Sequence, residues 1–223
     1  MPKSAKGRCT LCAHETTKGV MVKHLANCPR RQEQLANAAS GKPQTLIHLR
    51  VQDGYQNAFW LDVEVRGTAT LREIDSYLRR IWLECCGHMS KFTVGGWGGR
   101  DVAQSRRVDA VFTDDVELIH IYDFGTESIT RIKTVGSRHG TPVSRQPIVL
   151  LSRNLAPETS CVECDEPASH LCRECQSEWD SPGTLCTQHA KSHPHDDYGQ
   201  PIEIVNSPRM GLCGYDGPAD PPY

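Results

Sequence analysis

The stretch CTLCAHETTKGVMVKHLANC, residues 9–28, places four metal-type ligands at the spacing Cys-x2-Cys-x11-His-x3-Cys. Cysteines two residues apart let one tight turn present both sulfurs to a single ion, and tetrahedral zinc takes four such ligands. The histidine and the last cysteine are four residues apart, so they would lie on one face of a short helix. Apolar packing would come from Val20, Met21 and Leu25. Residues 1–31 are therefore predicted to form a C2HC zinc finger with the ligands Cys9, Cys12, His24 and Cys28.

A second cluster near the C-terminus again contains cysteine pairs two residues apart. Its eight ligands suit two tetrahedral ions, which brings the expected total to about three Zn²⁺ ions. Because four protein ligands would close each ion, we interpret these sites as structural rather than catalytic. The predicted ligands are Cys161, Cys164, Cys172, Cys175, Cys186, His189, His193 and His195.

The spacing leaves two pairings of these eight ligands open. An interleaved, B-box-like cross-brace is favoured, in which one ion takes Cys161, Cys164, Cys186 and His189, and the other takes the remaining four. In the alternative, one ion takes the first four cysteines in chain order, and the last cysteine joins the three histidines on the second ion.

The chain has 223 residues, of which 38% are hydrophobic and 6% aromatic, and this is lean for one large core. Small modules that bury little apolar surface need a metal or disulfide bonds. No apolar run approaches the roughly 18 residues of a membrane span, and the start MPKSAKGRCT lacks the apolar segment of a secretory signal. Paired cysteines without an export signal favour metal over disulfides, so a cytoplasmic protein without a membrane partner is expected.

The net charge of −2 hides an asymmetry, because residues 1–31 carry a net charge of +6 and the rest of the chain −8. A basic arm on an acidic body suggests an anionic partner, most commonly nucleic acid, although short tails are often basic without binding anything. The candidate phosphate contacts are Lys3, Lys6, Arg8, Lys18, Lys23, Arg30 and Arg31.

Alternating apolar and polar residues predict strands at 45–52 and 59–66, joined by a turn at Asp53-Gly54. Further strands are expected at 91–94, 116–124, 127–135 and 147–151. A capping box at Thr70 and Glu73 predicts a helix over about 71–84. Its apolar stripe comprises Leu71, Ile74, Leu78, Ile81 and Trp82.

Because the strands cluster rather than alternate with helices, the predicted fold class is α+β. We expect a central mixed sheet of five or six strands with one or two helices, flanked by small zinc-binding modules. The predicted division is 1–31 zinc finger, 32–44 linker, 45–152 α+β domain, 153–160 linker, 161–198 double-zinc module and 199–223 irregular tail.

No catalytic constellation is evident in the sequence. Cys85, Cys86 and His88 lie together, but the C-terminal end of a helix disfavours a thiolate. We therefore interpret Cys85 or Cys86 as a small core residue and His88 as a hydrogen-bonding residue at a corner of the chain. The Gly95–Gly99 loop lacks the Lys-Ser/Thr of a phosphate-binding loop. Asp123 lacks the companion motifs of a kinase, which favours a turn role. No small-molecule substrate is indicated, and the protein is predicted not to be an enzyme.

Three segments resemble the plasmid pRi open-reading-frame-three-like family. Tyr122-Asp123-Phe124-Gly125 is similar to its YDFG signature, and residues 78–90 and 206–215 are similar to one subgroup. Members are often labelled transposon passenger or resolvase-like proteins, and the resemblance over about 45–215 implies an α+β core followed by a zinc-binding segment. His195 stands where the subgroup usually has cysteine, and the N-terminal finger lies outside the family core.

The sequence thus predicts a non-enzymatic zinc protein, with a nucleic-acid-binding adaptor associated with mobile elements or regulation as the leading hypothesis. A single finger covers only about three base pairs, so its sequence preference would be modest. The alternatives are a protein-interaction module with structural zinc and, as the resolvase label implies, a DNA recombination enzyme.

Overall fold

The computed structural model describes residues 6–38, 41–83, 85–113 and 116–217. Nine strands form one sheet in the order β2-β1-β9-β4-β3-β8-β7-β5-β6, and every described pairing is antiparallel. The strands of this sheet are β1 Lys6–Cys9, β2 Glu15–Thr17, β3 Gln44–Asp53, β4 Trp60–Arg66, β5 Ser90–Val94, β6 Arg100–Val102, β7 Glu117–Tyr122, β8 Ser128–Gly140 and β9 Ile148–Asn154.

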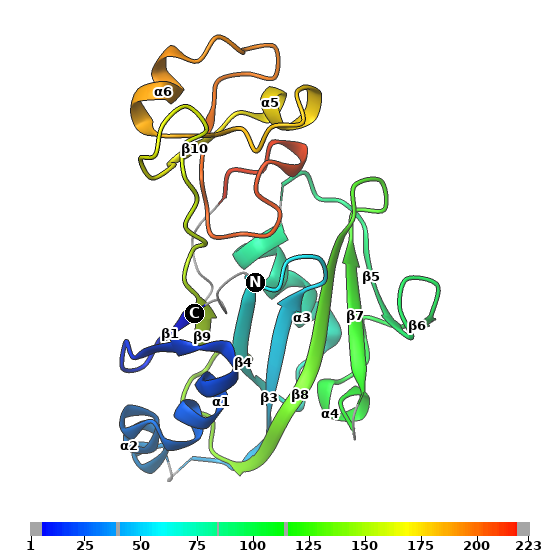
Figure 1. Cartoon of the computed structure of the whole chain (residues 1–223). Coiled ribbons are helices and arrows are strands. Elements are labelled where there is room, and N and C mark those ends of the chain that lie inside the picture. The colour runs from blue at the N-terminus through cyan, green and yellow to red at the C-terminus, as the bar shows by residue number, and fades with distance from the viewer. Residues whose placement is uncertain (1–5, 39–40, 84, 114–115, 218–223) are drawn as a thin grey trace.

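The helices and a small second sheet complete the fold (Figure 1). The second sheet has the strand order β11-β10-β12 and belongs to the C-terminal module. The remaining elements are α1 Lys18–Asn27, α2 Pro29–Asn37, α3 Leu71–Leu78, the π-helical turn η1 Arg79–Leu83, α4 Val108–Val111, β10 His170–Leu171, α5 Arg173–Glu178, β11 Thr184–Leu185, α6 Thr187–Ser192, β12 Ile202–Glu203 and the 3-10 turn η2 Leu212–Gly214.

The α+β class is confirmed, and the sheet is larger and more regular than expected. The strands predicted in the centre are present, but β6 and the two finger strands raise the number in the described sheet to nine, instead of five or six. Neighbouring strands such as β3 and β4 are joined by short connections, which only antiparallel pairs allow. The sheet expected to be mixed is therefore antiparallel throughout its described pairings.

The predicted helix begins as expected at its capping box. The backbone N–H and the hydroxyl of Thr70 both donate to Oε2 of Glu73, at 2.7 and 2.9 Å. The α-helix ends at Leu78 and continues as the wider turn η1. All five residues of the predicted apolar stripe are buried: Leu71, Ile74, Leu78, Ile81 and Trp82.

The sheet buries side chains on both faces, and a different layer covers each face. Along β4, Leu61 and Val63 point into the main core with α3, while Trp60 points to the opposite face because strand side chains alternate. There Trp60 packs against Met21 and Leu25 of α1. The finger is thus the covering layer of the second face.

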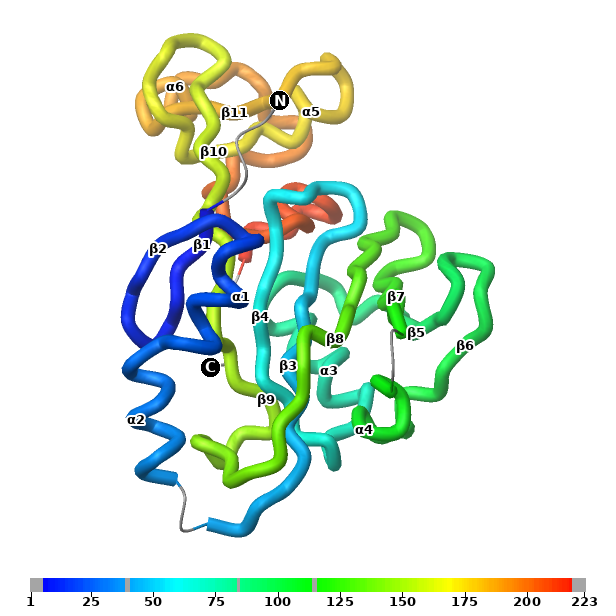
Figure 2. The backbone as a smooth tube through the Cα atoms, turned by 60° about the horizontal axis from the view of Figure 1, so that its bottom comes forward, coloured from blue at the N-terminus to red at the C-terminus, as the bar shows by residue number. Residues whose placement is uncertain are grey.

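The finger is joined to the central domain by backbone pairing as well as by packing. Gly7 pairs with Asn154 and Arg8 pairs with Arg153, so β1 extends the sheet at β9 (Figure 2). Two segments predicted as linkers contain regular structure, because α2 occupies much of 32–44 and β9 runs to Asn154. In the described part of the chain, no helix is long and apolar enough to cross a membrane.

Candidate metal centres

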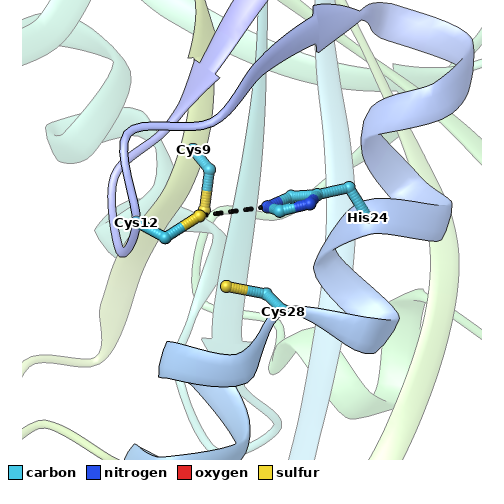
Figure 3. Close-up of side chains that lie close together, drawn as sticks. All are labelled: Cys9, Cys12, His24 and Cys28. Atoms are coloured by element: carbon cyan, nitrogen blue, oxygen red, sulfur yellow. Dashed lines mark hydrogen bonds between the residues drawn. The ribbon is translucent and has the colours of Figure 1, made fainter.

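The finger ligands converge from a turn, a helix and a helix junction. Cys9 ends β1, Cys12 lies in the following turn, His24 projects from α1, and Cys28 joins α1 to α2 (Figure 3). The four ligand atoms all lie within 4.8 Å of one another, and Sγ of Cys12 is 3.3 Å from Nε2 of His24. These side chains could hold one tetrahedral ion.

Local backbone geometry explains how the turn presents two sulfurs. Ala13 adopts a left-handed φ of 59°, and its N–H donates to the carbonyl of Cys9 at 3.0 Å. The turn brings Cys9 and Cys12 to the same side. Of the predicted packing residues, Met21 and Leu25 are buried, but Val20 is 51% exposed, because it lies on the outer face of α1.

Burial and neighbouring side chains shift the pKa values of two of the finger ligands. Burial, together with the neighbouring Cys12 thiol, raises the pKa of Cys9 to about 11 despite backbone hydrogen bonds that act the other way. Burial and the nearby His14 ring lower the pKa of His24, which favours the neutral imidazole that metal ions bind. Thiolate formation at Cys9 therefore needs a compensating positive charge, which a divalent ion could supply.

The eight C-terminal ligands assemble in the interleaved pattern. Cys161, Cys164, Cys186 and His189 form one group, in which Nδ1 of His189 lies 3.3 to 3.5 Å from the three sulfurs. Hydrogen bonds from backbone N–H groups and His189 outweigh burial and lower the pKa of Cys161 to about 6. This thiol is thus already disposed toward the anionic form that binds metal.

The second C-terminal group contains Cys172, Cys175, His193 and His195. Sγ of Cys175 lies 3.2 Å from Nε2 of His193 and 3.1 Å from Nδ1 of His195. Burial and the adjacent Cys172 raise the pKa of Cys175 to about 11. His170 stays outside both clusters, and its Nδ1 lies 2.8 Å from Oγ of Ser169.

Short elements of the module hold these ligands in place. α5 begins at the Cys172–Cys175 pair, and α6 carries His189 and ends just before His193. Leu185 of β11 is completely buried among the cysteines. Few apolar residues surround Leu185, and a module with so small an apolar centre commonly needs a bound metal for stability.

The basic residues of the finger do not form one open surface. Lys3 lies outside the described residues. Arg31 donates to Glu64 in a part-buried pair and also to the carbonyl of Leu25, while Lys18 donates to Gln52 at 2.7 Å. The structure leaves four of the predicted contacts exposed, namely Lys6, Arg8, Lys23 and Arg30.

Two of these four exposed side chains form ion pairs on the finger itself. Arg8 pairs with Glu15 and Arg30 with Glu33, both in exposed positions. Exposed pairs of this kind contribute little energy and would exchange readily for another anion.

Sequence reasoning missed a further group at the end of η1. Of the two cysteines considered for the core, Cys85 packs against it and Cys86 is exposed, and both lie with His88 close to Cys213. Nothing in the local sequence around Cys213 signals this, because its partners lie more than 120 residues earlier in the chain. Asp123 has the predicted turn role, since its Oδ1 accepts from the N–H groups of Gly125 and Thr126.

Comparison with known proteins adds little to this geometry. No family model and no curated protein matches the chain. Among solved structures, a protein of unknown function from Methanosarcina mazei Go1 is similar at 15% identity with a TM-score of 0.40. The similarity covers 47% of this chain and 66% of that protein.

Proposed function

We propose that this chain is a non-enzymatic adaptor, stabilised by three structural Zn²⁺ ions, whose C-terminal module binds a basic segment of another protein. Three groups of four Cys and His ligands support the first part, because four protein ligands leave no position open for a reacting water. A reducing compartment such as the cytoplasm would keep these thiols available to the metal.

An acidic groove beside the first C-terminal centre is the observation that carries the choice of partner. The groove has a volume of about 1060 Å³ and is lined by Glu158, Asp165 and Glu203, and none of its described lining residues is Lys or Arg. All three carboxylates are exposed. A segment of Lys or Arg residues would therefore find complementary charge there.

The charge of the whole module favours the same class of partner. Residues 161–198 contain eight acidic side chains, against only Arg173 and Lys191 as basic ones. An ion held by three thiolates and one neutral histidine adds a further net negative charge at the first centre. This end of the molecule would repel the phosphates of a nucleic acid.

Fluorescence anisotropy with an arginine- and lysine-rich peptide tests the proposal on the full-length zinc-loaded protein. Glu158→Gln together with Glu203→Gln should weaken binding at least tenfold, because two of the three groove carboxylates are lost. The matched control is Glu33→Gln, an exposed glutamate on α2, which should leave affinity unchanged. Equal binding of an acidic peptide of the same length would overturn the proposal.

Nucleic-acid binding through the finger remains a second candidate, favoured by the exposure of Lys6, Arg8, Lys23 and Arg30. Deleting residues 1–31 would be a poor test, since it would remove β1 from the sheet and uncover Trp60. Lys6→Glu with Lys23→Glu leaves the packing intact. Salt-dependent DNA binding that disappears in this variant would support the candidate, and no binding by the wild-type chain at low salt would exclude it.

A further inference from the structure

A fourth group of metal-type ligands lies where η1 meets the C-terminal tail. The ligand atoms of Cys85, Cys86, His88 and Cys213 all lie within 4.8 Å of one another. The sulfurs of the two adjacent cysteines are only 3.4 Å apart. Neighbouring residues on an extended strand would point in opposite directions, so this approach depends on the bend of the backbone at Cys85 and Cys86.

The tail that contributes Cys213 is held against the core independently of any ion. Oγ of Ser207 donates to the carbonyl of Trp82 at 2.6 Å, which fixes the tail to the end of η1. Arg209 is completely buried and donates to Asp123 at 2.6 Å and to Ser128 at 2.9 Å. The ligand group therefore rests on a polar network that is already satisfied.

This network also supplies positive charge to the sulfurs. Nε of Arg209 lies 3.4 Å from Sγ of Cys85, and its Nη2 lies 3.5 Å from Sγ of Cys213. A divalent ion bound to three thiolates retains one net negative charge, which the adjacent guanidinium would offset.

Two further observations point to a ligand at this position. Nε2 of His88 is buried and makes no hydrogen bond within the described part of the chain; an oxygen of Asp123 lies 3.4 Å away. Cys213 adopts a left-handed φ of 53°, a conformation that non-glycine residues adopt at a cost and that tends to occur at functional sites.

We propose that Cys85, Cys86, His88 and Cys213 form a fourth metal centre for a soft divalent cation such as Zn²⁺. Four thiolate and imidazole ligands, the number that tetrahedral coordination requires, favour this class of ion. The centre differs from the other three because two of its ligands, Cys86 and Cys213, are exposed. Its ion exchanges with the solvent, while the ions of the three buried or half-buried groups stay in place.

Metal analysis of the full-length protein, purified under reducing conditions, tests the count and the exchange. We expect about four Zn²⁺ per chain, falling to about three after brief treatment with a weak chelator, with an unchanged circular dichroism spectrum. Co²⁺ added to the partly stripped protein should then restore one equivalent and produce thiolate-to-cobalt charge-transfer absorption. Three ions in the untreated protein, or loss of all ions together, would overturn the proposal.

Substitutions of the proposed ligands test whether the exchangeable ion binds at these residues. Cys86→Ser and Cys213→Ser, both at exposed positions, should each lose one Zn²⁺ and the cobalt signal. His88→Gln provides a third variant in case a cysteine substitution disturbs folding. Met89→Ser is the matched control, since Met89 is 71% exposed beside His88 and is not one of the four grouped residues. Unchanged metal content in the folded ligand variants, or a disulfide among these thiols in the reduced wild-type protein, would contradict the assignment.

Discussion

Arg209 is a buried charged side chain that joins the C-terminal tail to the central domain. It is fully buried, pairs with Asp123, and has its guanidinium carbon 4.7 Å from the ring centroid of Tyr122. The guanidinium and the hydrogen bonds from Gly125 and Thr126 outweigh burial and bring the pKa of Asp123 to about 2. Removing the arginine would leave a carboxylate without its counter-charge in a poorly hydrated site.

We predict that Arg209→Met destabilises the chain by about 3–5 kcal/mol, because an uncompensated buried charge is more costly than the loss of the pair itself. Urea unfolding measures the effect. Adding Asp123→Asn should recover part of the loss, since it removes the uncompensated charge. If the double variant lost as much free energy of unfolding as the two single variants lose together, the two side chains would not be energetically coupled.

A second buried polar pair makes stability depend on pH. His120 is completely buried, and its Nε2 lies 2.7 Å from Oδ1 of Asp75. Burial lowers the pKa of His120 in spite of the opposing effect of Asp75. Hydrogen bonds from His120 and Ser90 outweigh burial and bring the pKa of Asp75 to about 2.

The neutral His120 contributes stability that is fully present above its ordinary pKa of about 6.5. That stability is lost as the pH falls from about 6.5 toward the lower pKa of the folded state, because the unfolded chain takes up the proton first. We therefore predict that the wild type loses more stability between about pH 8 and pH 5.5 than His120→Gln does. Protonation of the zinc ligands affects the wild type and the variant alike, so it cancels when their stabilities are compared. Parallel profiles of unfolding free energy against pH would contradict the prediction.

At the scale of elements, the attachment of β1 to the sheet depends on a glycine. A Cβ at Gly7 would lie within 2.5 Å of the Trp60 ring and of the backbone oxygen of Arg153. Only a residue without a side chain lets β1 reach β9 while Trp60 stays beneath the finger.

Gly7→Ala should therefore destabilise the finger by about 1–3 kcal/mol, as overpacking commonly does. Hydrogen exchange at the amides of β1 and α1 should accelerate. Gly19→Ala is the matched control, because nothing lies within 4 Å of its added carbon and alanine favours helix, so stability should change by less than about 1 kcal/mol. Equal exchange rates in both variants would show that the close approach does not restrict β1.

At the scale of the whole molecule, the ligand groups and the apolar core support different regions. The main core contains residues of β3, β4, α3, η1 and β7 and no predicted zinc ligand. In contrast, the C-terminal module is centred on its cysteines, and the finger core includes Cys9 and Cys28. Loss of the metal ions should therefore destabilise the finger and the C-terminal module more than the main core.

Exhaustive chelation is predicted to unfold the finger and the C-terminal module while the central sheet stays folded. Limited proteolysis with mass spectrometry should then show early cleavage within 6–38 and 161–198 and protection of 44–154. Zinc added back should restore the original digestion pattern. Cooperative loss of the whole sheet on chelation would contradict this division.

Some of these features follow from the sequence because they depend on local spacing. The Cys and His ligands of the finger lie within 20 residues of one another, so ligand spacing alone indicated how they would converge. Similarly, period-two and helical patterns located β3, β4 and α3, since one face of each packs against a core. The interleaved C-terminal pairing was one of two arrangements the spacing allowed, and folding of the module selected it.

Contacts between distant segments were decided only by the tertiary structure. β1 pairs with β9 and Arg209 pairs with Asp123 because the sheet brings these segments together. The same packing draws Arg31 into a buried ion pair with Glu64 and brings Cys213 to Cys85. A one-dimensional pattern records the character and spacing of neighbouring residues, whereas these contacts depend on which strands pair and where the tail is fixed.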